Sequence, residues 1–137
     1  PYALERCMTR QEIQKKLYEY TRLIHEKILQ DSQKSEMVEQ VIEYLEYHYE
    51  EDINFNDVAN EFFIAPNYLY RKFKEKKNMS VMQYLEDIRM KKAKELLKNS
   101  TLSVTEIAAR TGYGDSNYFS RIFKKSCGKT PREYRNQ

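Results

Sequence analysis

Tryptophan is absent from this sequence, and glycine, proline and cysteine are scarce: its 137 residues include three Gly, three Pro and two Cys. With so few helix-breaking residues, and no segment in which apolar and polar residues alternate, we predict an all-α chain. No run approaches the roughly 18 apolar residues that a membrane span requires. The first six residues lack the order of a signal peptide. The two widely spaced cysteines are typical of a reduced, cytoplasmic setting, which we expect for this protein. Because the sequence does not begin with Met, we also expect a segment upstream of it.

Candidate ligands for a metal are few. Cys7 and Cys127 lie far apart and match neither a disulfide framework nor a zinc-ligand spacing. Such thiols are typical of a reduced compartment. His25 and His48 have no His, Cys or acidic companion at ligand spacing. We therefore predict no metal site, no cofactor and no catalytic residues.

The charges are divided unevenly along the chain. Residues 1–50 carry seven Lys or Arg against ten Asp or Glu, whereas residues 51–137 carry seventeen against eleven. A surface that binds a polyanion is therefore expected in the C-terminal part. Many solvated helical domains are this basic, so charge alone does not identify the partner.

The N-terminal part is predicted to be a helix that begins after Thr9, which forms a capping box with Glu12, and ends at about Gln30. Met8 and Ile13 occupy the two positions of a hydrophobic staple. Apolar residues recur at intervals of four, three and four, at Ile13, Leu17, Tyr20 and Ile24. This spacing fits a short coiled-coil seam, which either joins two copies of the chain or packs on the chain's own domain.

A polar segment, residues 31–35, is predicted to interrupt the chain before a second helix. The apolar face of that second helix is formed by Val38, Val41, Ile42, Leu45 and Tyr49. From Glu51 onward the pattern changes to short helices separated by tight turns.

An internal repeat provides the main clue to function. Residues 67–74 match residues 117–124 at a constant offset of 50, and Ser80 falls opposite Thr130. Upstream, residues 58–59 align with residues 107–108 at an offset of 49, so the intervening turns differ by one residue. A coincidence of this length is not expected by chance.

Each copy contains the parts of a helix-turn-helix unit. In the second copy, at about residues 103–125, Ser103 and Glu106 form a capping box, Gly112 suits a left-handed helix end, and Asp115 caps the next helix. The core stripe of that helix consists of Phe119, Ile122 and Phe123. In the first copy, at about residues 54–75, the corresponding parts are Asn54, Val58, Ala59, Pro66, Leu69 and Phe73.

A longer helix, at about residues 80–98, is predicted to join the two copies. Ser80 is its N-cap, and its apolar face consists of Val81, Leu85, Ile88 and Leu96. At about 1.5 Å per residue this helix spans roughly 27 Å. Two helices held apart in this way could enter successive major grooves, which recur on one face of DNA about every 34 Å.

Residues 103–125 and the following Gly128–Arg135 resemble the C-terminal signature of the AraC/XylS family of bacterial transcription regulators. The resemblance covers roughly residues 36–135 and implies a seven-helix domain that binds double-stranded DNA through two helix-turn-helix units. Residues 1–35 would then connect it to an upstream domain. The first copy departs from the family pattern, with Phe63 where a turn glycine is common and Ala65 where a capping serine is usual. A positive φ would be strained at Phe63, so we expect that turn to differ in shape.

The resemblance also implies two sets of DNA-contacting residues. The outward residues of both second helices would read base edges: Asn67, Tyr70, Arg71, Ser116, Asn117, Ser120 and Arg121. Arg suits guanine and Asn suits adenine. The residues expected to contact phosphates are Lys74, Lys124, Lys125, Lys129 and Arg132. Tyr68 and Tyr118 could stack on sugars, but packing at the edge of the core is the favoured role.

We therefore predict a sequence-specific transcription regulator rather than an enzyme. RNA polymerase is a candidate partner, and a homodimer is a candidate assembly, through residues 10–30 or through the upstream domain. One alternative is a DNA-targeting module of a larger enzyme or sensor. Cys127 lacks the nearby His that would make it a reactive thiol of such an enzyme. The second alternative is a helical module whose basic face binds an acidic partner. In that case Arg71 and Arg121 would not discriminate between DNA sequences.

Overall fold

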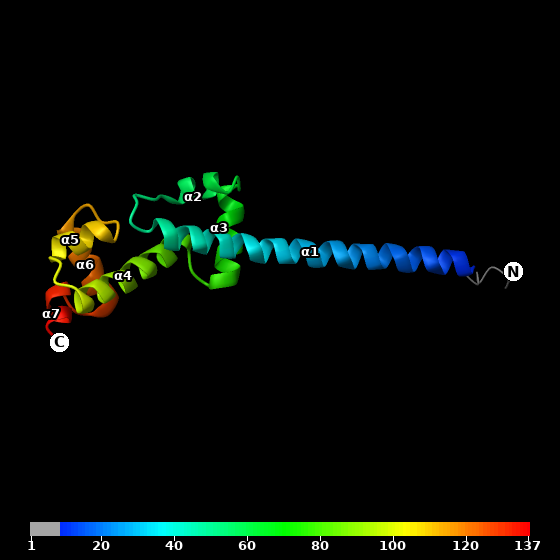
Figure 1. Ribbon diagram of the computed structural model, residues 1–137. Helices are drawn as coiled ribbons and strands as arrows, with labels where there is room; N and C mark the ends of the chain where they lie inside the picture. Colours follow the sequence, from blue (N-terminus) through cyan, green and yellow to red (C-terminus); the bar gives the residue numbers. More distant parts are fainter. Residues whose placement is uncertain (1–8) are drawn as a thin grey trace. The chain divides into compact units, whose positions relative to one another are not determined.

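The computed structural model describes residues 9–137, with the side chains of residues 31–35 left out of the description. This part of the chain is helical and contains seven α-helices (Figure 1). They are α1 (Arg10–His48), α2 (Phe55–Glu61), α3 (Pro66–Lys77), α4 (Val81–Asn99), α5 (Val104–Arg110), α6 (Ser116–Cys127) and α7 (Pro131–Arg135). Within the described residues, no helix combines the length and apolar character needed to cross a membrane.

Helix α1 is continuous, so the predicted interruption at residues 31–35 is wrong. The segment contains neither Gly nor Pro, and its polar residues lower helix propensity by only a few tenths of a kcal/mol each, roughly. A polar stretch of this kind ends the apolar stripe without ending the hydrogen-bonded backbone. The chain divides into two compact units after Met37, inside this helix.

The first unit, up to Met37, is described from Thr9. The predicted capping box is confirmed, because the Glu12 N–H donates to the Thr9 hydroxyl at 3.3 Å and the Thr9 N–H donates to the Glu12 carboxylate at 2.9 Å. Met8 of the predicted staple and Cys7 lie outside the described residues. The side chains of the predicted seam are largely exposed, from 46% at Ile13 to 63% at Tyr20.

The second unit, Val38–Gln137, holds two cores. The first subdomain buries Val38, Val41, Ile42, Leu45, Ile53, Val58, Ala59, Leu69, Phe73, Val81 and Leu85. The second subdomain buries Met90, Ala93, Leu97, Ile107, Ala108, Tyr113, Phe119 and Phe123. Helix α4 contributes to both and runs from the α2–α3 pair to the cluster of α5, α6 and α7 (Figure 1).

The buried face of α4 differs from the predicted one. Val81 and Leu85 are buried as expected, but Ile88 and Leu96 are only partly buried. In their place, Met90, Ala93 and Leu97 enter the second core. The reason is that α4 packs on one subdomain with its first half and on the other with its second, so its apolar stripe shifts around the helix.

The turns of the two helix-turn-helix units differ by one residue in length but begin alike, because the equivalent position in each holds the positive φ that was expected to be strained at Phe63. Its φ is +53°, close to the +85° of Gly112 at the equivalent position. The next residue in each turn donates to an alanine carbonyl at 2.9 Å, Ile64 to Ala59 and Tyr113 to Ala108. The Phe63 side chain is 98% exposed, so it accepts the left-handed conformation without a clash in the core.

Candidate nucleic-acid interface

Helix α3 presents the first predicted reading face. Pro66 at its start needs no hydrogen-bond acceptor for a backbone N–H, so the helix begins although Ala65 provides no side-chain cap. Leu69 and Phe73 are buried and fix the rotation of the helix. The residues left exposed on its other side are Asn67, Tyr70, Arg71 and Lys74.

Two aromatic rings support the basic side chains of α3. The Arg71 guanidinium lies 5.9 Å from the centroid of the Tyr68 ring. The Lys74 ammonium lies 5.5 Å from the Tyr70 ring and donates to the Tyr70 hydroxyl at 3.3 Å. A shallow, open hollow is lined by Tyr70, Arg71, Lys74 and Glu75. The exposed face of α3 therefore combines positive charge with flat apolar surface.

Helix α6 presents the second predicted reading face. The Asp115 carboxylate accepts the backbone N–H groups of Asn117 at 2.8 Å and Tyr118 at 3.4 Å, which confirms the predicted N-cap. Phe119 and Phe123 are fully buried. Asn117 and Arg121 are exposed, whereas the predicted base readers Ser116 and Ser120 are half-buried.

The repeat extends to side-chain contacts. The Arg121 guanidinium lies 5.8 Å from the centroid of the Tyr118 ring, the counterpart of the contact between Arg71 and Tyr68. Tyr118 is 48% exposed. Its ring contacts Arg121 on the exposed side and Tyr113 at the edge of the core, where the two ring centroids are 6.0 Å apart. The sequence pattern predicted core-edge packing for Tyr68 and Tyr118 but not their contacts with the two arginines.

The basic groups of the two faces have no carboxylate partner among the described residues. This group consists of Arg71, Lys74, Arg121, Lys124, Lys125, Lys129 and Arg132, all exposed. By contrast, the ammonium groups of Lys76 and Lys77 lie 3.2 and 3.7 Å from the Glu39 carboxylate. The hydrogen bond from Lys76, with the nearby charge of Lys77, lowers the pKa of Glu39. The unpaired charges therefore lie where a polyanion would meet α3, α6 and α7.

Helix α7 begins with a capping box formed by Thr130 and Glu133. The Thr130 hydroxyl accepts the Glu133 N–H at 3.2 Å, and the Glu133 carboxylate accepts the Thr130 N–H at 3.2 Å. Pro131 is buried at the start of the helix, and Tyr134 of the same helix packs against the second core. Lys129 and Arg132 are left exposed on either side of Thr130.

One expectation for the histidines is wrong. His48 does have an acidic companion, since its Nδ1 lies 2.9 Å from the Glu51 carboxylate. The pair was not predicted because it forms in the turn after α1, where the Glu51 N–H donates to the His48 carbonyl and brings the two side chains together. In the part of the chain that is described, no cluster of three metal-ligating side chains occurs. Cys127 is a free thiol.

Comparison with known proteins identifies a helix-turn-helix domain. The helix-turn-helix domain family matches residues 58–137. The HTH-type transcriptional activator RhaS of Escherichia coli O1:K1 is 37% identical over 95 residues, which cover 69% of this chain and 34% of RhaS. The C-terminal domain of AraT, a response regulator from Geobacillus stearothermophilus, superimposes with a TM-score of 0.72 at 38% identity, covering 73% of this chain and 84% of that one.

The chain belongs to the AraC family. It therefore contains a helix-turn-helix DNA-binding domain of the kind found in transcription regulators. The match spans about a third of the length of the curated AraC-family relatives. The same fold occurs in the DNA-binding domain of AdpA, whose structure was solved in complex with a target DNA, with a TM-score of 0.69 at 24% identity over 72% of this chain and 89% of that one.

Proposed function

We propose that this AraC-family domain reads two successive major-groove segments of one DNA site, with α3 in one and α6 in the other. The observation that carries the proposal is the pair of equivalent arginines, Arg71 and Arg121, each exposed and each lying over a tyrosine ring. Attraction between the guanidinium and the ring face favours the side-chain rotamers that keep each arginine over its tyrosine. An arginine held in this way can donate two hydrogen bonds to one guanine.

The other exposed residues of the two helices fit supporting roles. Asn67 and Asn117 can pair with adenine edges, and Tyr70 offers an apolar surface and a hydroxyl beside them. Ser116 and Ser120, being half-buried, would contact bases only where α6 approaches most closely. The residues proposed to position the domain by phosphate contacts are Lys74, Lys124, Lys125, Lys129 and Arg132.

The length of α4 matches the proposed docking. Its 19 residues correspond to about 28 Å at roughly 1.5 Å per residue. Successive major grooves recur on one face of DNA about every 34 Å. A helix that enters both cores can therefore hold two reading helices within reach of one face of the duplex. We place this activity in the bacterial cytoplasm, in the control of transcription.

Selection of bound duplexes from a random pool tests the proposal. The 137-residue chain should enrich a motif of two elements whose centres lie about one helical turn, roughly 10 bp, apart. Recovery should fall as salt rises, because phosphate contacts release counterions. If binding fades with salt but no motif is enriched, the basic surface is only electrostatic and the proposed reading of sequence is wrong.

We further propose that a second copy of the chain covers the apolar stripe of α1. Ile13, Leu17, Tyr20 and Ile24 are exposed at coiled-coil spacing, whereas the opposite side carries an ion pair between Arg22 and Glu26, with an N···O distance of 3.7 Å. An exposed apolar stripe at coiled-coil spacing is the pattern of a helix that pairs with a second helix of the same kind.

Changing Leu17 to Asp should abolish this dimer, because it places a charge in the middle of the seam. Sedimentation equilibrium would report a monomer for Leu17→Asp and a dimer for the unchanged chain. Lys15→Asp, on the opposite side of the same helix from the stripe, is the matched control and should remain dimeric. A monomeric unchanged chain at micromolar concentrations would exclude the pairing.

A further inference from the structure

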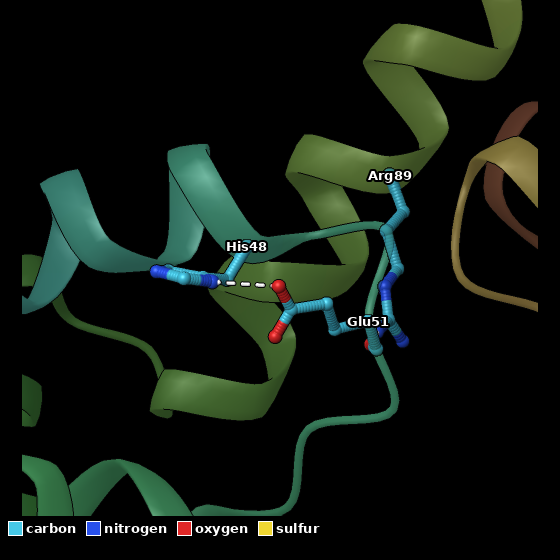
Figure 2. Close-up of polar contacts among 3 residues, drawn as sticks. All are labelled: His48, Glu51 and Arg89. Carbon is cyan, nitrogen blue, oxygen red and sulfur yellow. Dashed lines mark hydrogen bonds and ion pairs between the residues drawn. The ribbon is translucent and has the colours of Figure 1, made fainter.

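Arg89, near the middle of α4, contacts parts of both subdomains at once. Its Nε donates to the Tyr49 carbonyl at 2.9 Å, and its Nη2 donates to the Glu51 carbonyl at 2.8 Å. Both carbonyls belong to the segment between α1 and α2, in the first subdomain. Figure 2 shows the side chain extending from α4 to this segment, where the Glu51 carboxylate pairs with His48.

The same guanidinium also faces the second subdomain. It lies 5.4 Å from the centroid of the Tyr113 ring, in the turn between α5 and α6. That ring is 8% exposed and packs on Phe119 of α6, with centroids 5.5 Å apart. Arg89 is thus connected through one buried ring to a reading helix.

The two subdomains touch at this point. A Cβ added to Gly112 would lie 2.5 Å from the Tyr49 carbonyl oxygen and 2.8 Å from the Arg89 guanidinium carbon. Only a residue without a side chain lets the α5–α6 turn approach the end of α1 so closely. The Arg89 side chain therefore lies between the end of α1 and this turn.

We infer that Arg89 is a positioning residue that fixes the orientation of the second reading helix relative to the first, and thereby the spacing of the two DNA elements that the domain accepts. The inference rests on the proposed two-headed reading, in which α3 and α6 each read one element of a single DNA site. An arginine suits this role because its planar fork can bind two carbonyls with one edge while its face lies on an aromatic ring. Lysine has one donor group without a flat face, so it can replace only part of the contact.

Fixing the two reading helices should make binding sensitive to the spacing of the two DNA elements. When α3 and α6 are held at a fixed distance and rotation, binding of the second DNA element after the first is an intramolecular step. One inserted base pair rotates the second element by about 35° and moves it about 3.4 Å along the axis. A fixed pair of reading helices cannot follow this change, whereas a loosened pair can adjust to it.

The test compares three duplexes: the selected site, the same site with one base pair inserted between the elements, and a site with only one element intact. The unchanged chain should prefer the selected site over the inserted one by roughly tenfold or more. In Arg89→Lys and Arg89→Ala this ratio should fall to within about twofold, with affinity for the single-element duplex changing less than about twofold. Lys91→Ala removes a positive charge from the same helix and should keep the strict preference.

Each outcome decides a different point. If the unchanged chain binds the selected and inserted duplexes equally, the proposed two-headed reading fails before Arg89 is tested. If the unchanged chain is strict and both Arg89 variants are equally strict, the positioning role is excluded. If Arg89→Lys loses single-element binding as severely as binding to the selected site, Arg89 maintains the fold of a subdomain and does not set the spacing.

Discussion

Replacing Phe119 with Ala is expected to lower the free energy of unfolding of the domain by about 3–5 kcal/mol. Phe119 is fully buried on α6 and contacts the rings of Tyr113 and Phe123, with centroids 5.5 and 5.9 Å away. Truncation would remove apolar burial and leave a cavity in the second core, which has eight buried members among the described residues and little capacity to close around the cavity. Urea unfolding followed by circular dichroism measures the loss.

The chain provides a matched control in Phe63, which is 98% exposed. Phe63→Ala removes the same atoms but should change the free energy of unfolding by less than about 0.5 kcal/mol, since alanine keeps the same positive φ and no buried contact is lost. Equal losses at the two positions would contradict the assignment of Phe119 to the second core.

Gly112→Ala is expected to destabilise the domain by about 2–5 kcal/mol. An L side chain at the +85° φ of Gly112 costs about 1–2 kcal/mol. The added Cβ would also lie 2.5 Å from the Tyr49 carbonyl oxygen, and moving this backbone apart should cost about 1–3 kcal/mol more. The same unfolding experiment measures the sum.

Two other glycines separate these two costs. Gly128 has a φ of +79° with open space where a Cβ would lie, so Gly128→Ala should show only the conformational cost of about 1–2 kcal/mol. Gly114 has open space and no left-handed φ, so Gly114→Ala should lie within about 0.5 kcal/mol of the unchanged domain. If Gly112→Ala were no worse than Gly128→Ala, the close approach of the two subdomains would be wrong.

Local signals in the sequence were sufficient to predict the helix starts and the repeated units. Ser103 and Glu106 exchange the two hydrogen bonds of their capping box, at 3.1 and 2.9 Å, because each needs only a partner three residues away. The core residues Phe119 and Phe123 follow from helical spacing alone. The exposed positions of Arg71 and Arg121 follow from the same spacing, since the opposite side of each helix is apolar.

The remaining features depend on partners distant in sequence or on small energy differences. Arg89 binds carbonyls 40 and 38 residues away, and no pattern within α4 marks it. The left-handed Phe63 was not predicted, because a strain of about 1–2 kcal/mol is offset by burial elsewhere in the unit. The continuity of α1 through residues 31–35 was also not predicted, because it depends on small differences in helix propensity and the segment contains no Gly or Pro that would end a helix.

The central claim, that α3 and α6 each read one element of a single site, is tested most directly by repeating the DNA selection with Arg71→Ala and Arg121→Ala. Each variant should relax the base preference in a different element while the other element stays intact, with a loss of about 1–3 kcal/mol for the affected base. Arg22→Ala, which removes a positive charge from α1, should leave the motif unchanged. If both arginine variants relaxed the same element, or weakened all sequences uniformly, the two-headed reading would be contradicted.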